Sequence, residues 1–174
     1  DATGDVGTVM ATRGDGVQGD IEADSDIRMV RAVNGSITGE SIDAGGSVFT
    51  VMATGGNITS DIEADGGDVR QVRASARYDR EERKWQDGNI TGDVTASEGI
   101  GTVMATRGGI QSYIHAESGD VRMVRATGGD IAGGPIEAGG AVYTVMASGG
   151  DVTADIDAGG RISRVMAQAR RGRR

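Results

Sequence analysis

One tripeptide, Val-x-Ala, returns along almost the whole chain at a nearly constant spacing of 21 residues. A second series, Ile-x-Ala or Val-x-Ala, lies about half-way between successive members of the first. Self-similarity at a fixed period indicates a repeat architecture, in which each unit contacts its neighbours. The first series ends at Ala11, Ala32, Ala53, Ala74, Ala105, Ala126, Ala147 and Ala167, and the second at Ala23, Ala44, Ala64, Ala96, Ala116, Ala138 and Ala158.

The alternation inside each tripeptide predicts β-strands, because residues two apart on a strand share one face. Gly-Gly pairs recur at many of the corners, where they would break helices but suit turns. A unit of 21 residues with short strands cannot bury its own apolar face, so the units must stack. We therefore predict an all-β fold, a single β-solenoid (parallel β-helix) of about eight coils over residues 1–174. The pattern leaves the handedness and the cross-section open.

The octapeptide GTVMATRG at residues 7–14 recurs at residues 101–108, which indicates duplication of a four-coil block with an insertion. The charged insertion at residues 75–87 interrupts the period, and we place it at a coil corner, where repeat proteins tolerate extra residues. Its segment YDREERK has a composition that favours helix. It is interpreted either as a decorated loop or as a contact point through Tyr78 and Trp85. Residues 168–174 form a basic C-terminal tail.

Composition excludes several classes of site and partner. The chain has no Cys, so neither a disulfide scaffold nor a thiolate metal site is available. A net charge of −8 argues against nucleic acid, which attracts basic surfaces. No apolar run approaches the roughly 20 residues of a membrane span. Because the sequence begins without Met, we expect a processed product or a piece of a longer chain.

The residues that flank the inward-facing Val, Ile and Ala are expected to form stripes along the solenoid. Beside the Ile-x-Ala strands these residues are mostly acidic, whereas beside the Val-x-Ala strands they alternate between Met and Arg. Exposed Met and Arg are favoured at protein interfaces. We predict an interface made of Met10, Arg31, Met52, Arg73, Met104, Arg125, Met146 and Met166, together with Tyr78 and Trp85 of the insertion.

No catalytic or cofactor-binding residue is predicted. Tyr113 and His115 interrupt the acidic face, but the chain has no second His and no Cys to complete a site. Each coil repeats nearly the same carboxylates, which is typical of a surface rather than of an acid–base pair. We expect no enzyme and no cofactor. Bridging of the acidic face by Ca²⁺ remains open, since carboxylates are its preferred ligands.

Units such as GGSVFTVMA at residues 45–53 and GGNITSDIEA at residues 55–64 resemble the Gly-rich β-solenoid repeats of large secreted bacterial surface proteins, of adhesin and filament-forming types. There is a looser resemblance to bactofilins, cytoskeletal β-helices that polymerise end to end. The resemblance implies an extracellular or cell-surface location and self-association.

The sequence therefore predicts a structural subunit that stacks head to tail into an extracellular filament or stalk, with side-by-side association as a second mode. The alternative is an adhesin-like rod segment whose acidic face binds a ligand or a cation. A carbohydrate-active β-helix enzyme is a third reading, but it would need a groove with several aromatic residues, and the sequence contains few.

Overall fold

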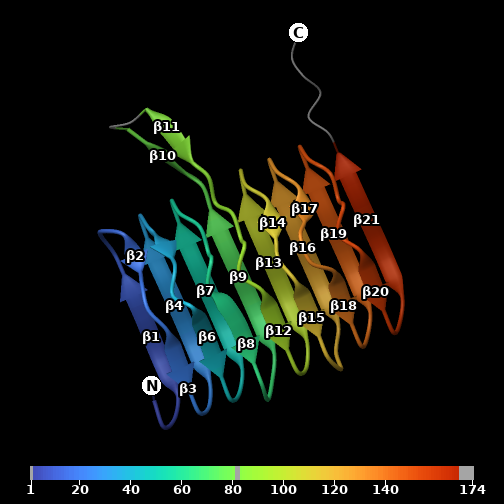
Figure 1. Ribbon diagram of the computed structural model, residues 1–174, viewed down its shortest axis with the longest axis horizontal. Coiled ribbons are helices and arrows are strands. Elements are labelled where there is room, and N and C mark those ends of the chain that lie inside the picture. The colour runs from blue at the N-terminus through green and yellow to red at the C-terminus, as the bar shows by residue number, and fades with distance from the viewer. Residues whose placement is uncertain (1, 81–82, 169–174) are drawn as a thin grey trace.

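In the computed structural model, which describes residues 2–80 and 83–168, the chain winds into a β-solenoid of about eight coils (Figure 1). Successive strands of each face pair in parallel, about 21 residues apart. This confirms the predicted all-β fold. Among the described residues there is no helix, and so none with the length and apolarity needed to cross a membrane.

The longest strand of each coil carries the Val-x-Ala tripeptide, and eight of these strands form one parallel sheet, the long sheet. Equivalent residues stack on one another, so that Val30 pairs with Val51 and Ala32 with Ala53. The strands of the long sheet are β1 (Val6–Ala11), β4 (Ile27–Val33), β7 (Val48–Thr54), β9 (Val69–Ser75), β13 (Ile100–Thr106), β16 (Val121–Thr127), β19 (Val142–Ser148) and β21 (Ile162–Gln168).

The second series of tripeptides forms a parallel sheet of seven shorter strands, the short sheet. Between the two sheets each coil crosses a narrow third face, where single parallel bridges such as Ile58 to Ile90 continue the ladder. Each complete coil therefore has two broad sides and one narrow side. The short sheet comprises β3 (Ile21–Ala23), β6 (Ser41–Ala44), β8 (Asp61–Ala64), β12 (Val94–Ala96), β15 (Ile114–Ala116), β18 (Ile136–Ala138) and β20 (Ile156–Ala158), and the third face β2 (Gly16–Val17), β5 (Ser36–Ile37), β14 (Ile110–Gln111) and β17 (Ile131–Ala132).

A single apolar core runs through the coils and takes side chains from all three faces. Val103 and Ala105 of the long sheet, Ile114 of the short sheet and Ile110 of the third face are each 0% exposed. These are the inward positions that the alternation predicts, and the residues between them face outward. Because the core is one column of Val, Ile and Ala, every inner coil depends on the coil on either side for its burial.

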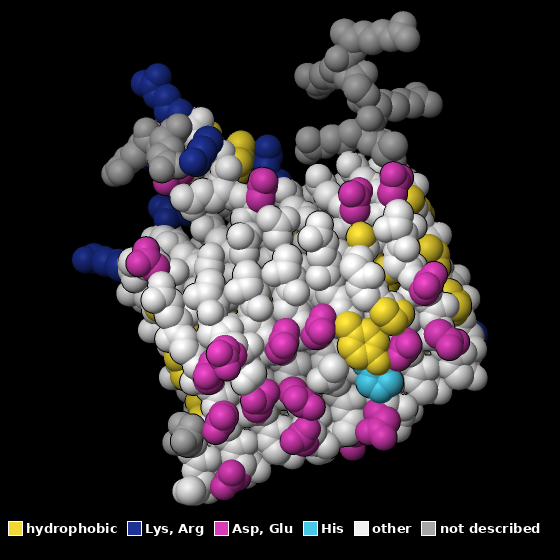
Figure 2. Space-filling view, viewed as in Figure 1, with side chains coloured by type: hydrophobic (Ala, Val, Ile, Leu, Met, Phe, Trp, Pro, Cys, Tyr) yellow, Lys and Arg dark blue, Asp and Glu magenta, His cyan; other side chains and the backbone are white. Residues whose placement is uncertain are grey.

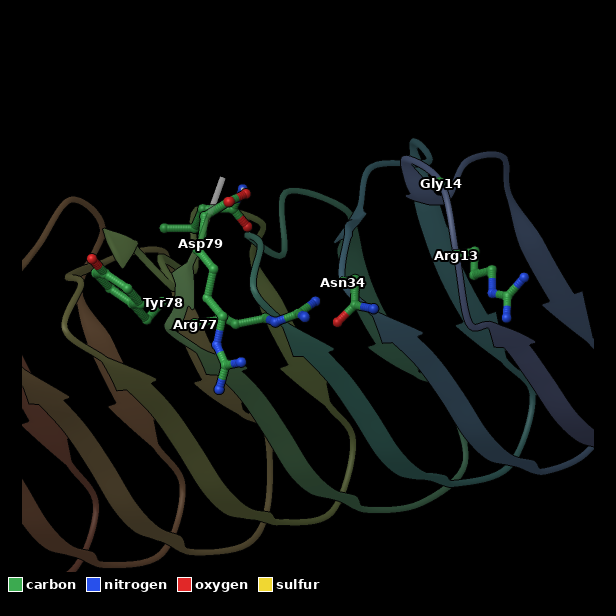
Figure 3. Close-up of a pocket in the computed structure, with 8 residues that line it drawn as sticks. Arg13, Gly14, Asn34, Arg77, Tyr78 and Asp79 are labelled. Carbon is green, nitrogen blue, oxygen red and sulfur yellow. The ribbon is translucent and has the colours of Figure 1, made fainter. Parts of the chain in front are cut away.

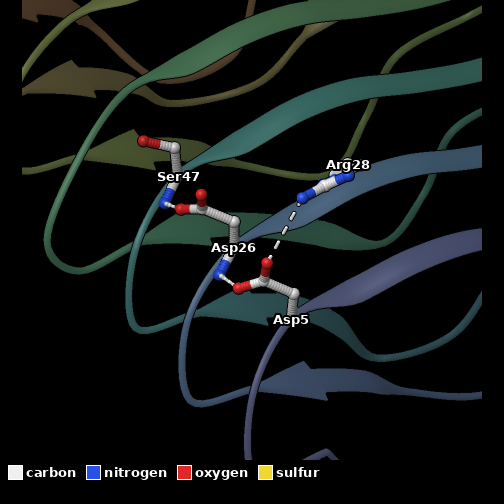
Figure 4. Close-up of polar contacts among 4 residues, drawn as sticks. All are labelled: Asp5, Asp26, Arg28 and Ser47. Carbon is white, nitrogen blue, oxygen red and sulfur yellow. Dashed lines mark hydrogen bonds and ion pairs between the residues drawn. The ribbon is translucent and has the colours of Figure 1, made fainter.

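Small polar residues at the corners tie each coil to the next (Figure 4). The backbone N–H of Asp26 donates to Oδ1 of Asp5 at 3.3 Å, and that of Ser47 donates to Oδ1 of Asp26 at 2.8 Å. The same bond recurs at the other two corners, for example from Asn89 N to Oδ1 of Asn57 at 2.9 Å. These side chains satisfy corner N–H groups that no strand pairing reaches. In each of these bonds, which we call the corner rungs, the acceptor belongs to the earlier coil. The corner rungs therefore all run in the same direction along the solenoid.

The insertion forms an antiparallel β-hairpin, β10 (Arg77–Asp79) and β11 (Lys84–Gln86), which projects from the corner after β9 (Figure 1). The helical composition of YDREERK was therefore misleading for the described part of this segment. Tyr78 and Trp85 pair across the two strands, with ring centroids 5.4 Å apart and planes inclined at 63°. Such aromatic cross-strand pairs favour hairpins, and this tertiary pair outweighs the weak helix propensity.

Candidate interaction surfaces

The predicted Met and Arg positions of the long sheet stand in one unbroken line. The strand register places Met10 beside Arg31, Arg31 beside Met52, and so on through Met146 and Met166. Met10, in the first coil, is 55% exposed, whereas the other members of the line are half-buried against their neighbours. The complete line is Met10, Arg31, Met52, Arg73, Met104, Arg125, Met146 and Met166.

The arginines of this line do not all have hydrogen-bond partners. Nε of Arg73 donates to Oγ of Ser75 at 2.9 Å, two residues along the same strand. At the equivalent place next to Arg31 the chain has Val33, and Nε of Arg31 is buried without a partner. Nε of Arg125 is likewise buried and unpaired. A buried donor without an acceptor is costly, so these two Nε atoms disfavour the present arrangement of the arginine side chains.

A second line of arginines on the long sheet was missed by the sequence analysis. Arg28, Arg70 and Arg122 follow the first inward residue of their strands, at positions outside the tripeptide that was used to find the stripes. Arg70 lies over the ring of Phe49, 4.4 Å from its centroid, and Arg28 pairs with Asp5 at 3.5 Å. The signal was present, because the residue after that Val or Ile alternates between Arg and other types for most of the chain.

The outer side of the short sheet carries two lines of polar residues with different roles (Figure 2). In the line that precedes the tripeptides, the carboxylates serve the fold: Oδ1 of Asp61 accepts from the N–H of Asp93, and Oδ1 of Asp93 from that of Tyr113. The side chains of the second line do not take part in these bonds to the backbone. We call this second line the acidic line, and it comprises Glu22, Asp43, Glu63, Thr95, His115, Glu137 and Asp157.

Crowding of carboxylates is evident at Glu63. Desolvation raises the pKa of its carboxyl group, and the negative charges of Asp65, Asp43 and Asp61 raise it further. Proximity of like charges favours the protonated form, and a cation between the carboxylates would relieve the repulsion. Among residues 2–80 and 83–168, however, no three acidic or His side chains converge closely enough to hold a metal ion.

Tyr113, His115 and Glu137 form a cluster where the acidic line is interrupted. The Tyr113 hydroxyl donates to Oε2 of Glu137 at 2.6 Å, and Nδ1 of His115 lies 3.1 Å from the same oxygen. The two rings stack with centroids 5.5 Å apart and planes 16° apart. The hydrogen bond to Glu137 raises the pKa of Tyr113 to about 12. A protonated phenol is a poor nucleophile. The stacked rings of the cluster instead present a flat aromatic surface beside a carboxylate.

The hairpin residues predicted to make contacts are partly used within the chain. Tyr78 and Trp85 are 44% and 47% exposed, and the guanidinium of Arg107 lies 4.1 Å from the centroid of the Trp85 ring. Of the predicted basic tail, only Gln168 lies within the described part of the chain, and residues 169–174 lie outside it.

Comparison of the chain with models of protein families, with curated proteins and with solved structures found no match.

The long sheet presents a flat face with apolar and cationic residues, and the short sheet presents an acidic one. These two faces are complementary in charge.

Proposed function

We propose that this protein is a non-enzymatic structural subunit whose coils stack end to end, and through their flat faces side by side, into a filament or stalk outside the cell. The extracellular location rests on the resemblance to secreted surface repeats, and the mode of assembly rests on the geometry of the coils.

The observation that supports end-to-end stacking is the edge of β21. Its inward residues Ile162 and Val165 are 46% and 48% exposed, whereas their partners Val142 and Val145 in β19 are 0% exposed. Among the described strands, β21 pairs with β19 alone. An unpaired edge of a parallel sheet is a template for another strand, and an apolar edge favours one. In a second copy, β1 carries the same pattern of Val, Val and Ala in the same register.

The corner rungs give this stacking a direction. Asp130 and Asp93 already accept N–H groups from the following coil, at 2.8 Å and 2.7 Å. Asp151 and Asp155 occupy the equivalent corners in the last described coil, where their carboxylates are exposed. A second copy placed head to tail would bring its first corner N–H groups to these acceptors, which favours a polar filament over a symmetric dimer.

Side-by-side association is supported by the contrast between the two broad faces. The long sheet exposes Arg28, Arg70 and Arg122, whereas the short sheet carries carboxylates on its outer side in most coils. The coils of both faces repeat about every 4.8 Å, so the arginines in alternate coils lie about 9.6 Å apart. Each such arginine would face two successive coils of a short sheet, and complementary charges favour contact between the long sheet of one rod and the short sheet of another.

Sedimentation velocity over a range of protein concentrations tests the end-to-end contact. We expect the wild-type chain to form species that grow with concentration, and Val165→Asp to remain a single rod, because a carboxylate at the edge would be buried by the next coil. Ser163→Asp is the matched control, since Ser163 is an exposed neighbour whose equivalents face outward, and it should assemble as the wild type does. A wild type that stays monomeric at all concentrations would overturn the proposal.

The lateral contact is tested separately with Met52→Asp combined with Met146→Asp. Both side chains lie on the outer face of the long sheet, so the fold should survive. We expect single filaments that no longer associate into bundles. Bundles unchanged by this double substitution would remove the long sheet from the lateral contact.

A binding rod is the second candidate, favoured by the stacked rings of Tyr113 and His115 beside Glu137. A flat aromatic ledge with adjacent carboxylates suits a ligand with an apolar face and hydroxyl groups, such as a sugar. Titration with Ca²⁺ and with neutral oligosaccharides, followed by the intrinsic NMR signals of His115, distinguishes this function. Unperturbed signals throughout would leave only the structural role.

A further inference from the structure

The hairpin extends from its corner over the turns of the first two coils. A cavity of about 950 Å³ lies between the hairpin and these turns. Arg13, Gly14 and Asn34 contribute to it from the turns after β1 and β4, and β10 and β11 form its other side (Figure 3). The cavity is within the range of sites that hold small molecules.

Positive charges outnumber negative ones among the described residues that line this cavity. These residues include Arg13, Arg77 and Arg80 and one acidic residue, Asp79, so their formal charges sum to +2. The Asp79 carboxylate is already engaged, since Oδ2 accepts from Nε2 of Gln86 at 3.2 Å. The three arginines at this cavity contrast with the net charge of −8 of the chain.

These three guanidinium groups differ from the other arginines near aromatic or acidic side chains. Arg107 lies over Trp85 and Arg70 over Phe49, and Arg28 pairs with Asp5. Within the described part of the chain, Arg13, Arg77 and Arg80 have no carboxylate or ring partner. Their five N–H donors each are therefore available to an incoming acceptor.

The equivalent arginines of the two GTVMATRG copies lie on different sides of the hairpin. In the second copy, Arg107 covers Trp85 on one side of the hairpin. In the first copy, Arg13 faces the cavity on the other side, with the amide of Asn34 beside it. Asn34 has a positive φ of 67°, a conformation that Asn tolerates better than most residues and that forms the tight corner at this point.

We propose that this cavity is a binding site for small polyanions, that is, for molecules with at least two phosphate or carboxylate groups. Guanidinium groups bind both kinds of oxyanion through paired N–H···O bonds, and such groups on both sides of the cavity favour ligands with more than one negative charge. The Asn34 and Gln86 amides supply further hydrogen bonds. Binding at this site does not depend on the proposed end-to-end association of subunits.

Isothermal titration calorimetry with sodium triphosphate and with citrate tests the site, and acetate serves as a single-charge reference. We expect one site per chain for triphosphate, for citrate or for both, an affinity that falls with added salt, and no comparable binding of acetate. Arg13→Gln and Arg77→Gln should each weaken binding about tenfold, because each removes a charge-assisted pair of bonds.

Arg122→Gln is the matched control, because it removes the same charge from an exposed position on the long sheet, outside the cavity. Its affinity should equal that of the wild type, and NMR amide shifts of Gly14 and Asn34 should report the bound anion. Failure of both polyanions to bind, or equal weakening by Arg122→Gln, would overturn the proposal. Circular dichroism of each variant verifies that the fold is retained.

Discussion

The octapeptide GTVMATRG occurs twice, at residues 7–14 and 101–108, and its two copies have different surroundings. The second copy lies in β13, between β9 and β16, whereas the first lies in β1, which pairs with β4 alone among the described strands. Val103 is fully buried, while the equivalent Val9 is half-buried. Identical residues thus differ in burial only because of their neighbours.

The corners of the two copies also differ in backbone conformation. In the second copy Arg107 has a φ of 59°, and its N–H donates to the carbonyl oxygen of Thr127 in the next coil at 2.5 Å. In the first copy the residue with positive φ is Gly14, at 81°. A left-handed Arg is strained, so the bond to Thr127 in the next coil offsets the cost of this conformation. In a solenoid the bonds between coils therefore influence the backbone conformation of each turn.

The largest expected difference between the copies is in the core. Val103→Asp buries a carboxylate in the middle of the ladder and should lower the free energy of unfolding by about 4 kcal/mol or more. Val9→Asp leaves the carboxylate partly in water and should cost about 1–2 kcal/mol. Urea denaturation followed by circular dichroism measures both. Equal losses would contradict the claim that burial depends on the flanking coils.

A smaller difference is expected at the glycine that ends the octapeptide. A Cβ on Gly108 would lie 2.5 Å from the carbonyl oxygen of Gly88, so Gly108→Ala must push two coils apart and should cost about 2–3 kcal/mol. A Cβ on Gly14 meets nothing within 4 Å, and Gly14→Ala should cost about 1 kcal/mol through its positive φ alone. The same denaturation experiment measures both losses of stability. A greater loss for Gly14→Ala than for Gly108→Ala would contradict the claim that contact between coils sets the cost.

The smallest expected difference concerns the arginines. Trp85 is the single Trp of the chain, so its fluorescence reports on the hairpin. Arg107→Gln should shift this emission and lower stability by about 0.5–1 kcal/mol, because the cation over the ring is lost. Arg13→Gln, in the identical octapeptide, should change neither. An emission shift of the same size in both variants would mean that Arg107 has no special contact with Trp85.

The sequence predicted the fold well because period, alternation and corner glycines all indicate the same architecture. Val-x-Ala spacing placed Val103 and Ala105 in the core, and both are buried. The hairpin could not be predicted, since the Tyr78–Trp85 pair forms only once the two strands face each other. Local composition there favours helix, and a tertiary contact prevails.

Surface roles were harder to infer than burial. The acidic residues before the short-sheet strands looked like part of a binding face, yet Asp61 and Asp93 bond to backbone N–H groups of the following coil. The sequence shows that such a residue faces outward but not which N–H lies within its reach. In the same way, the cavity beside Arg13 depends on the hairpin, which lies more than 60 residues further along the chain.

Electron microscopy of the purified chain tests the central claim, that the solenoid stacks end to end, most directly. The account predicts unbranched filaments with a 4.8 Å spacing along the axis and a subunit repeat of about eight coils, roughly 40 Å. Val165→Asp should abolish these filaments, and Ser163→Asp should preserve them. Isolated rods of a single subunit, at every concentration of the wild-type chain, would contradict the claim.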